Sequence, residues 1–207
     1  MPFFYQQNIN ETAHLAIWSI QEPASFFETD VQLAVPIANE ERRIQHLAVR
    51  LLFKLMMPAA DLNQLVMADN GKPYLIGLPF HFSFSHCKGY AACAVDDKPI
   101  GIDIEIIHPR ISKVAHKFLN DSEKAMIANL EQEDQLNQLA FLWAAKEAMY
   151  KKYEQLGIDF AKDFNILELT QSDRGTVPAE ILHKGNKINI RLDYHFGADY
   201  VCVTCYS

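Results

Sequence analysis

Residues 100–106 restrict the fold of this chain more than any other segment, because isoleucines alternate there with glycine and acidic residues. A period of two predicts a β-strand with the isoleucines on one face and Asp103 and Glu105 on the other. Further along, a segment with a helical pattern places Glu147 and Lys151 four positions apart and therefore on one face. This strand and helix can bring the three carboxylates and the lysine together. Such a group suits a hard divalent cation that holds a phosphorylated ligand.

The composition is typical of a folded protein of one large or two small domains. The chain has 207 residues, of which 49% are hydrophobic and 22% charged. Residues 1–7 lack the features of a signal peptide, and no stretch approaches the roughly 20 apolar residues of a membrane span. The net charge of −7 argues against general nucleic-acid binding, which needs a basic surface. We therefore expect a cytoplasmic protein with no nucleic-acid or membrane partner.

Periodicity elsewhere indicates strands, a long helix and strands again in each half of the chain. A helix is expected over 39–57 with Asn39 as its N-cap, and a hairpin around 69–71. The other expected elements are strands over 3–9, 14–20, 81–85, 90–95, 165–170, 179–182, 187–194 and 200–206, helices over 121–131 and 134–153, and turns at 173–175 and 185–186. We predict an α+β fold with two similar α/β halves, 1–98 and 99–207, packed as a pseudo-dimer with the active site in the cleft between them. Because such a chain contains its own internal interface, we expect a monomer.

A basic segment follows the strand that carries the carboxylates. No acid occurs between positions 106 and 120, whereas Arg110, Lys113 and Lys117 add positive charge and Phe118 adds an apolar side chain. A helix beginning near Ile111 would gather the lysines on one side. The simple interpretation is a solvated basic face, and the alternative is a docking surface for an acidic partner.

Several further groups suit phosphate oxygens, although each has an ordinary structural explanation when taken alone. A serine and a histidine end one expected strand, a lysine lies in a glycine–proline turn, and two arginines share one face of the first helix. These residues are Ser85, His86, Lys72, Arg43 and Arg50.

In this order along the chain, the motifs resemble those of the 4′-phosphopantetheinyl transferases, specifically the larger, two-halved, single-chain type. The matching motifs are the helix from Arg43 to Arg50, Gly71-Lys72-Pro73, Phe82-Ser83-Phe84-Ser85-His86, Gly101-Ile102-Asp103-Ile104-Glu105, and Phe141-Leu142-Trp143-Ala144-Ala145-Lys146-Glu147-Ala148 with Lys151. The resemblance covers roughly positions 40 to 155 as spaced motifs. The two acidic motifs are the specific part of it.

The resemblance implies transfer of the 4′-phosphopantetheine arm of coenzyme A to a serine of an apo acyl or peptidyl carrier protein, with release of adenosine 3′,5′-bisphosphate. It implies that Asp103, Glu105 and Glu147 bind Mg²⁺, with Mn²⁺ as an alternative, and that Glu147, Lys151 and Asp103 are catalytic. It assigns coenzyme A binding to the first half, and the metal site and carrier docking to the second half. The implied coenzyme A contacts are Arg43, Arg50, Lys72, Ser85, His86 and Lys146, and the implied docking residues are Arg110, Lys113, Lys117 and Phe118.

Two alternative functions stay open at this point. A magnesium-dependent phosphodiesterase or pyrophosphatase would use the same acids, with water as the nucleophile and coenzyme A-like substrates. A non-catalytic module that binds coenzyme A or a carrier domain would keep the pocket without needing both Glu147 and Lys151.

Overall fold

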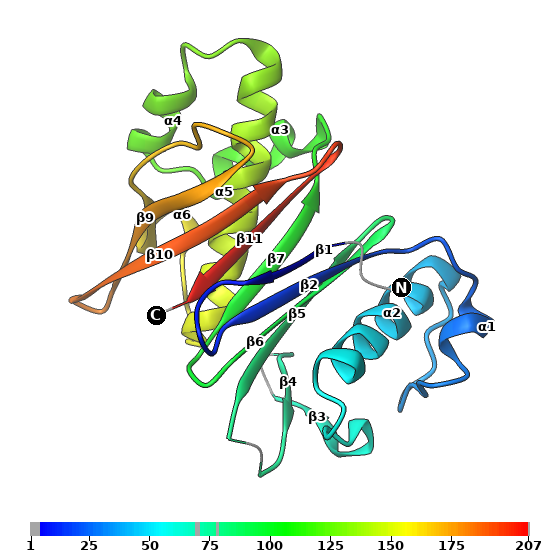
Figure 1. The fold of residues 1–207 in the computed structure, drawn as a ribbon. Helices are drawn as coiled ribbons and strands as arrows, with labels where there is room; N and C mark the ends of the chain where they lie inside the picture. Colours follow the sequence, from blue (N-terminus) through cyan, green and yellow to red (C-terminus); the bar gives the residue numbers. More distant parts are fainter. Residues whose placement is uncertain (1–4, 69–70, 78, 207) are drawn as a thin grey trace. The chain divides into compact units, whose positions relative to one another are not determined.

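The computed structural model describes residues 5–68, 71–77 and 79–206, which form two compact units, Met1–Pro99 and Ile100–Ser207. Each unit combines helices with antiparallel sheet, so the expected α+β class is confirmed (Figure 1). The pseudo-dimer with a cleft between its halves stays a prediction. Among the described residues, no helix is both long and apolar enough to cross a membrane.

The first unit is built on a four-stranded antiparallel sheet with the strand order β1-β2-β6-β5. The strands are β1 (Tyr5–Asn8), β2 (His14–Ser19), β5 (His81–Cys87) and β6 (Tyr90–Asp96). Helix α2 (Glu40–Met56) packs along this sheet and buries its apolar face there. Phe53 of α2 lies against the rings of Phe82 and Phe84 on β5, with ring centroids 4.6 and 5.3 Å apart. These aromatic contacts fix α2 beside β5.

The bounds of α2 follow from its sequence, and they confirm the helix expected over 39–57. Asn39 caps the helix, because its side chain accepts a hydrogen bond from the backbone N–H of Arg42 at 2.8 Å. Acidic residues occupy the first turn and Lys54 the last, which complements the helix dipole. The helix stops at Met56, two residues before Pro58.

The smaller elements of the first unit lie outside its main sheet. Strands β3 (Leu65–Met67) and β4 (Pro73–Leu75) pair antiparallel, as expected of a hairpin here, but positions 69–70 of its turn lie outside the described residues. Positions 3–4 of the first expected strand lie outside them as well. The remaining elements are α1 (Ala24–Phe27) and a 3₁₀ helix (Leu62–Gln64), which the sequence patterns did not predict.

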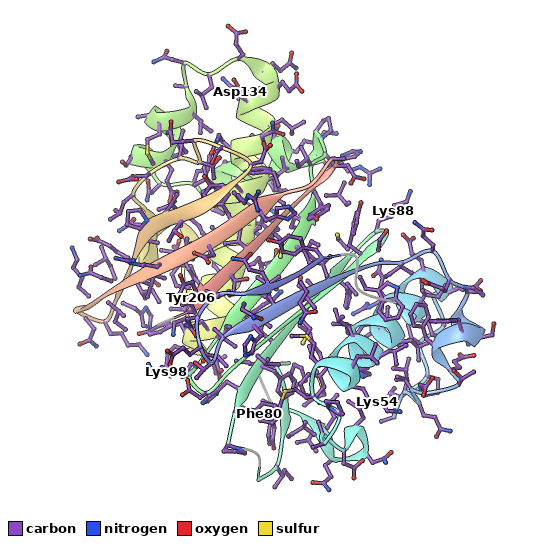
Figure 2. All side chains as sticks on the ribbon, viewed as in Figure 1. Lys54, Phe80, Lys88, Lys98, Asp134 and Tyr206 are labelled. Carbon is purple, nitrogen blue, oxygen red and sulfur yellow. The ribbon has the colours of Figure 1, made fainter. Side chains whose placement is uncertain are left out.

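The second unit is built on a five-stranded antiparallel sheet with the order β7-β11-β10-β9-β8. The strands are β7 (Gly101–Ile106), β8 (Phe164–Ile166), β9 (Arg174–His183), β10 (Asn186–Phe196) and β11 (Tyr200–Tyr206). The long helix α5 (Gln132–Tyr153) packs on β7 and β11. Ala144, Ala145 and Ala148 are fully buried on α5, and such small side chains permit a close approach of helix and sheet. Asp134 marks the first turn of α5 (Figure 2).

The short helices of this unit precede and follow α5, and they differ in part from the expected ones. They are α3 (Arg110–Val114), a 3₁₀ helix (Ala115–Lys117), α4 (Asp121–Ile127) and α6 (Phe160–Asp163). The helix expected to begin near Ile111 is therefore one short α-helix followed by a 3₁₀ turn. The helix expected over 121–131 ends four residues early.

The expected turn at 173–175 is wrong, because Arg174 and Gly175 already belong to β9. The ladder between β9 and β10 extends to the pair Arg174–His195, so strand pairing overrides the local turn signal. A Cβ atom at Gly175 would lie 2.9 Å from the hydroxyl of Tyr194. The glycine therefore provides room for a neighbouring ring rather than a turn. The strand expected over 165–170 has only three residues.

Candidate active site

Strand β7 and helix α5 pass unusually close to each other at Gly101. A Cβ atom there would lie 2.8 Å from the backbone nitrogen of Lys152 and would also meet the carbonyl oxygen of Ala148. Because side chains alternate along a strand, Asp103 and Glu105 lie on the same face as Gly101, toward α5. The close approach therefore brings both acids to the helix that carries Glu147 and Lys151.

Lys151 ties the helix to the strand. Its ammonium group donates hydrogen bonds to Oδ1 of Asp103 at 2.6 Å and to the carbonyl oxygen of Ile102 at 3.0 Å. The side chain of Asp103 is 6% exposed and that of Lys151 is 24% exposed. Because water screens such a pair poorly, its charge interaction is stronger than that of a surface ion pair.

The other two acids are partly buried in the same place. Burial and the charge of Asp103 raise the pKa of Glu105 to about 7, although a hydrogen bond from Trp143 Nε1 at 3.0 Å opposes this shift. Burial and Asp103 also raise the pKa of Glu147 to about 7, and Lys151 opposes that shift. Three carboxyl groups thus share one ammonium group, and the excess of negative charge favours binding of a cation.

The donor set fits Mg²⁺ or Mn²⁺ in its chemistry, since both ions prefer carboxylate oxygens. Among the described residues, however, no three acidic, histidine or cysteine side chains converge into a ready-made metal site. Instead, Lys151 donates to one oxygen of Asp103, and Trp143 donates to one oxygen of Glu105. A metal ion would therefore bind the second oxygen of each of these carboxylates or displace the two donors.

Substituting Gly101 with alanine should damage the site without touching an acid. The added methyl group would meet backbone atoms of α5, which cannot swing aside, so the strand and helix would have to separate. We expect a loss of about 1–3 kcal/mol in the free energy of unfolding, measured by urea denaturation. Gly185→Ala is a comparison at an open turn, where nothing surrounds a Cβ atom but φ is +79°. If Gly101→Ala were as stable as wild type, the close approach of β7 and α5 would be wrong.

The structure contradicts the expected contact between Lys146 and the phosphates of coenzyme A. Lys146 has no exposed surface. Its ammonium group donates to the carbonyl oxygens of Phe118 and Phe160 at 2.7 and 2.9 Å and to Oε2 of Glu123 at 2.7 Å. All three of its protons are therefore used inside the unit, and none is available for a ligand.

A family model identifies the segment that holds this site. The model of the 4′-phosphopantetheinyl transferase superfamily matches residues 99–205, which are just over half of the chain and include β7 and α5. The chain belongs to the 4′-phosphopantetheinyl transferase superfamily. This finding confirms the family indicated by the motifs.

Individual relatives agree with this family assignment. A 4′-phosphopantetheinyl transferase of Bacillus subtilis is 34% identical over 114 residues, which cover 55% of this chain and 50% of the relative. The 4′-phosphopantetheinyl transferase psf-1 of Bacillus pumilus is 37% identical over 98 residues, covering 46% and 42%. A holo-acyl-carrier-protein synthase of Campylobacter hominis is 39% identical over 92 residues, covering 40% and 71%. The chain thus spans about half the length of the two Bacillus transferases.

In the first unit, two of the expected coenzyme A contacts of this family are neighbours of one histidine. The ring of His46 on α2 packs against the ring of His86 on β5, with centroids 4.6 Å apart. Arg50 donates to the carbonyl oxygen of His46 at 2.9 Å. Sequence reasoning missed His46, although it lies between Arg43 and Arg50 on the same side of the helix.

The other expected coenzyme A contacts are more dispersed. Arg43 pairs with Glu28 at 3.2 Å, and both side chains are about two-fifths exposed (38% and 43%), which is an ordinary surface ion pair. Lys72 is half-buried beside the β3–β4 hairpin, and Ser85 is buried on β5 next to His86. The assignments of Arg43, Lys72 and Ser85 to coenzyme A stay predictions.

The residues expected to dock a carrier protein divide into two groups. Arg110, Lys113 and Lys117 are exposed on α3 and the 3₁₀ turn after it. Phe118 is 1% exposed and packs against the indole of Trp143, with ring centroids 5.2 Å apart. Its predicted role in docking is wrong, because it belongs to the buried core of the second unit.

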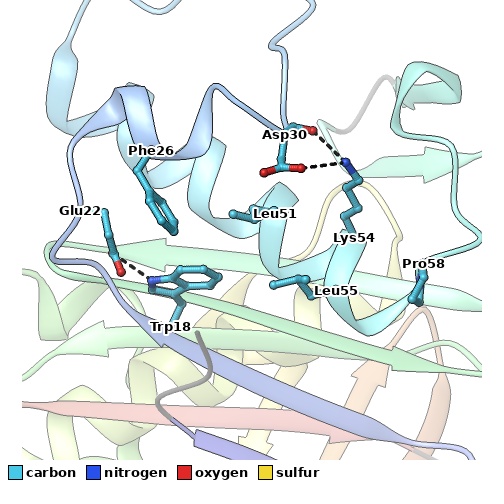
Figure 3. A pocket seen from close by; sticks show the side chains of 8 residues that line it. All are labelled: Trp18, Glu22, Phe26, Asp30, Leu51, Lys54, Leu55 and Pro58. Carbon is cyan, nitrogen blue, oxygen red and sulfur yellow. Dashed lines mark hydrogen bonds and ion pairs between the residues drawn. The ribbon is translucent and has the colours of Figure 1, made fainter. Parts of the chain in front are cut away.

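A separate pocket in the first unit has a volume of about 540 Å³ (Figure 3). Its lining residues are Trp18, Glu22, Phe26, Asp30, Leu51, Lys54, Leu55 and Pro58. The indole N–H of Trp18 donates to Glu22, and Lys54 pairs with Asp30 (Figure 3). None of the predicted site residues lines this pocket, so it has no part in the site described above.

Proposed function

We propose that this protein transfers the 4′-phosphopantetheine group of coenzyme A to a serine of an apo carrier protein and releases adenosine 3′,5′-bisphosphate. One observation carries the proposal: Asp103, Glu105, Glu147 and Lys151 meet on β7 and α5, within the segment that matches the superfamily. Relatives that match this chain are named 4′-phosphopantetheinyl transferase and holo-acyl-carrier-protein synthase. Because only about half of the Bacillus relatives is covered, the activity of the whole protein is a proposal.

We propose that Asp103, Glu105 and Glu147 hold Mg²⁺, with Mn²⁺ as an alternative. The support is their shared excess of negative charge, which adds to the effect of burial in raising the pKa values of Glu105 and Glu147. A bound divalent ion would neutralise phosphate charge and polarise the phosphorus.

The side chains can then divide the work of phosphoryl transfer. The serine oxygen of the carrier forms a bond to phosphorus while the bond to the oxygen of the leaving adenosine bisphosphate breaks. A pKa of about 7 suits Glu147 to accept the serine proton near neutral pH. Lys151 is placed by Asp103 as a positive charge that stabilises the departing phosphate.

Magnesium should stabilise the folded protein through these acids. At about a hundred times its dissociation constant, a ligand of the native state adds about 2.7 kcal/mol to the free energy of unfolding. Differential scanning fluorimetry should therefore show that Mg²⁺ raises the melting temperature of wild type. The rise should be much smaller for Glu105→Gln, whose amide oxygen can still accept a hydrogen bond from Trp143. An equal rise in both proteins would contradict the metal assignment.

We propose that the exposed basic residues of α3 and the following turn dock the carrier protein, whose domains tend to be acidic. The charge reversals Lys113→Glu and Lys117→Glu together should raise KM for an apo carrier protein about tenfold or more and leave kcat nearly unchanged. Lys124→Glu, on the exposed face of α4, is the matched control. An unchanged KM in the double variant would remove this docking surface. Monomeric state, cytoplasmic location and the absence of a nucleic-acid partner stay predictions.

A further inference from the structure

The rings of His46 and His86 and the guanidinium group of Arg50 form a cluster of basic side chains in the first unit. The two imidazoles lie 4.6 Å apart at an angle of 56°. Nη1 of Arg50 lies 2.9 Å from the carbonyl oxygen of His46 and 3.3 Å from its Nδ1. Because a guanidinium group can only donate, Nδ1 of His46 must be the acceptor and carries no proton in this arrangement.

The charges around His46 explain why it is neutral. Burial, together with the positive charges of His86, Arg50 and Arg42, lowers the pKa of His46 to about 4. Helix α2 also packs against α1, β2 and β6. Among the described residues, these elements add no charge that acts on His46. The acids near α1, Glu28 and Asp30, pair with Arg43 and Lys54 instead.

We propose that His46 is a further ligand-binding residue, which takes up a proton from solvent when a phosphate group of the substrate binds to this cluster. The inference rests on the proposed function, because coenzyme A would supply the phosphate. The charged groups that act on His46 are all positive, and an incoming phosphate adds a negative charge. Its oxygens can accept from Arg50 and from the newly protonated His46, which then no longer accepts from Arg50.

The direction of the pH dependence follows from the proton uptake. In the free protein, His46 is neutral above about pH 4. A bound phosphate raises this pKa. At a pH between the pKa of His46 in the free protein and its pKa in the complex, binding of one ligand is accompanied by the uptake of as much as one proton. Affinity then falls by up to tenfold per pH unit as the pH rises through that window. Phosphomonoester ionisation near pH 6 acts in the opposite direction, but equally in wild type and variant.

Isothermal titration calorimetry with coenzyme A, in two buffers of different ionisation enthalpy, measures the proton uptake. At about pH 6.5, the ordinary pKa of histidine, wild type should take up ~0.5–1 proton more per ligand than His46→Gln. The variant should also bind about tenfold more weakly, and this difference should shrink at about pH 8. His81→Gln, an exposed histidine at the start of β5, should behave like wild type. Thermal melts of His46→Gln and His46→Asn show whether each is folded.

Coenzyme A carries two kinds of phosphate group, a phosphomonoester and a pyrophosphate. Dephospho-coenzyme A lacks the phosphomonoester and therefore distinguishes them. Loss of the extra proton uptake with this ligand assigns the cluster to the monoester, and retention assigns it to the pyrophosphate. Equal proton uptake by wild type and both folded His46 variants would overturn the inference. If wild type still modified a carrier protein in that case, the proposed function would stand without it. Failure of coenzyme A to bind wild type at all would overturn both.

Discussion

Replacing Glu147 with glutamine should lower kcat for carrier modification by about 10³-fold, within the usual range for loss of a general base. The amide cannot accept the serine proton and is a weaker ligand for a divalent cation. The fold should survive, because the substitution removes a partly buried acid whose charge is opposed by Asp103. We therefore expect the melting temperature without metal to stay the same or rise.

The matched control for this variant is Glu133→Gln, an exposed acid in the first turn of the same helix. Its kcat should equal that of wild type. Steady-state rates with saturating coenzyme A and magnesium provide the measurement, with intact mass of the carrier as the readout. A Glu147→Gln protein that retained more than about a tenth of wild-type kcat would exclude Glu147 as the base.

Replacing Glu123 with alanine should destabilise the second unit by about 3–5 kcal/mol, the usual effect of breaking a buried ion pair. Glu123 has no exposed surface, and its carboxylate accepts hydrogen bonds from Lys146, from the backbone N–H of Asn120 at 3.0 Å and from that of Ile166 at 3.1 Å. Without it, the buried ammonium group of Lys146 would lose its ion-pair partner. A native protein has only about 5–15 kcal/mol of stability in total, so the loss is large.

A double variant separates the buried charge from the packing. Glu123→Leu combined with Lys146→Met removes both charges and should recover much of the stability lost in Glu123→Ala, because an apolar pair often replaces a buried ion pair without cost. Urea denaturation measures all three proteins. Lys124→Met, which breaks the exposed pair with Asp121 on the same helix, should change nothing measurable. A fully stable Glu123→Ala protein would contradict the burial of this pair.

The sequence predicted the candidate site because local periodicity encodes it. Alternation along 100–106 places Asp103 and Glu105 on one face of a strand, and helical spacing places Glu147 and Lys151 on one face of a helix. The structure brings Lys151 to Asp103 through the ion pair at 2.6 Å. Gly101 permits this ion pair because it has no side chain to hold the helix away from the strand. The sequence alone does not show this role, since it depends on how closely α5 packs on β7.

The role of Lys146 could not be predicted from the same patterns. Its three partners come from segments that are separated along the chain: Phe118, Glu123 and Phe160. Glu123 lies three residues after Asn120 and forms a capping box with it. This local role is enough to explain the acid in the sequence, so the sequence alone does not indicate its tertiary ion pair with Lys146. Phe118 was misassigned for a similar reason, since only packing against Trp143 shows it to be core.

The most direct test of the proposed function is the intact mass of an apo carrier protein after incubation with this protein, coenzyme A and Mg²⁺. We predict a mass gain of one phosphopantetheine group, abolished by a chelator and by Glu147→Gln. The absence of this gain with acyl and peptidyl carriers alike would contradict the account. Hydrolysis of coenzyme A in the same reactions would then indicate a phosphodiesterase.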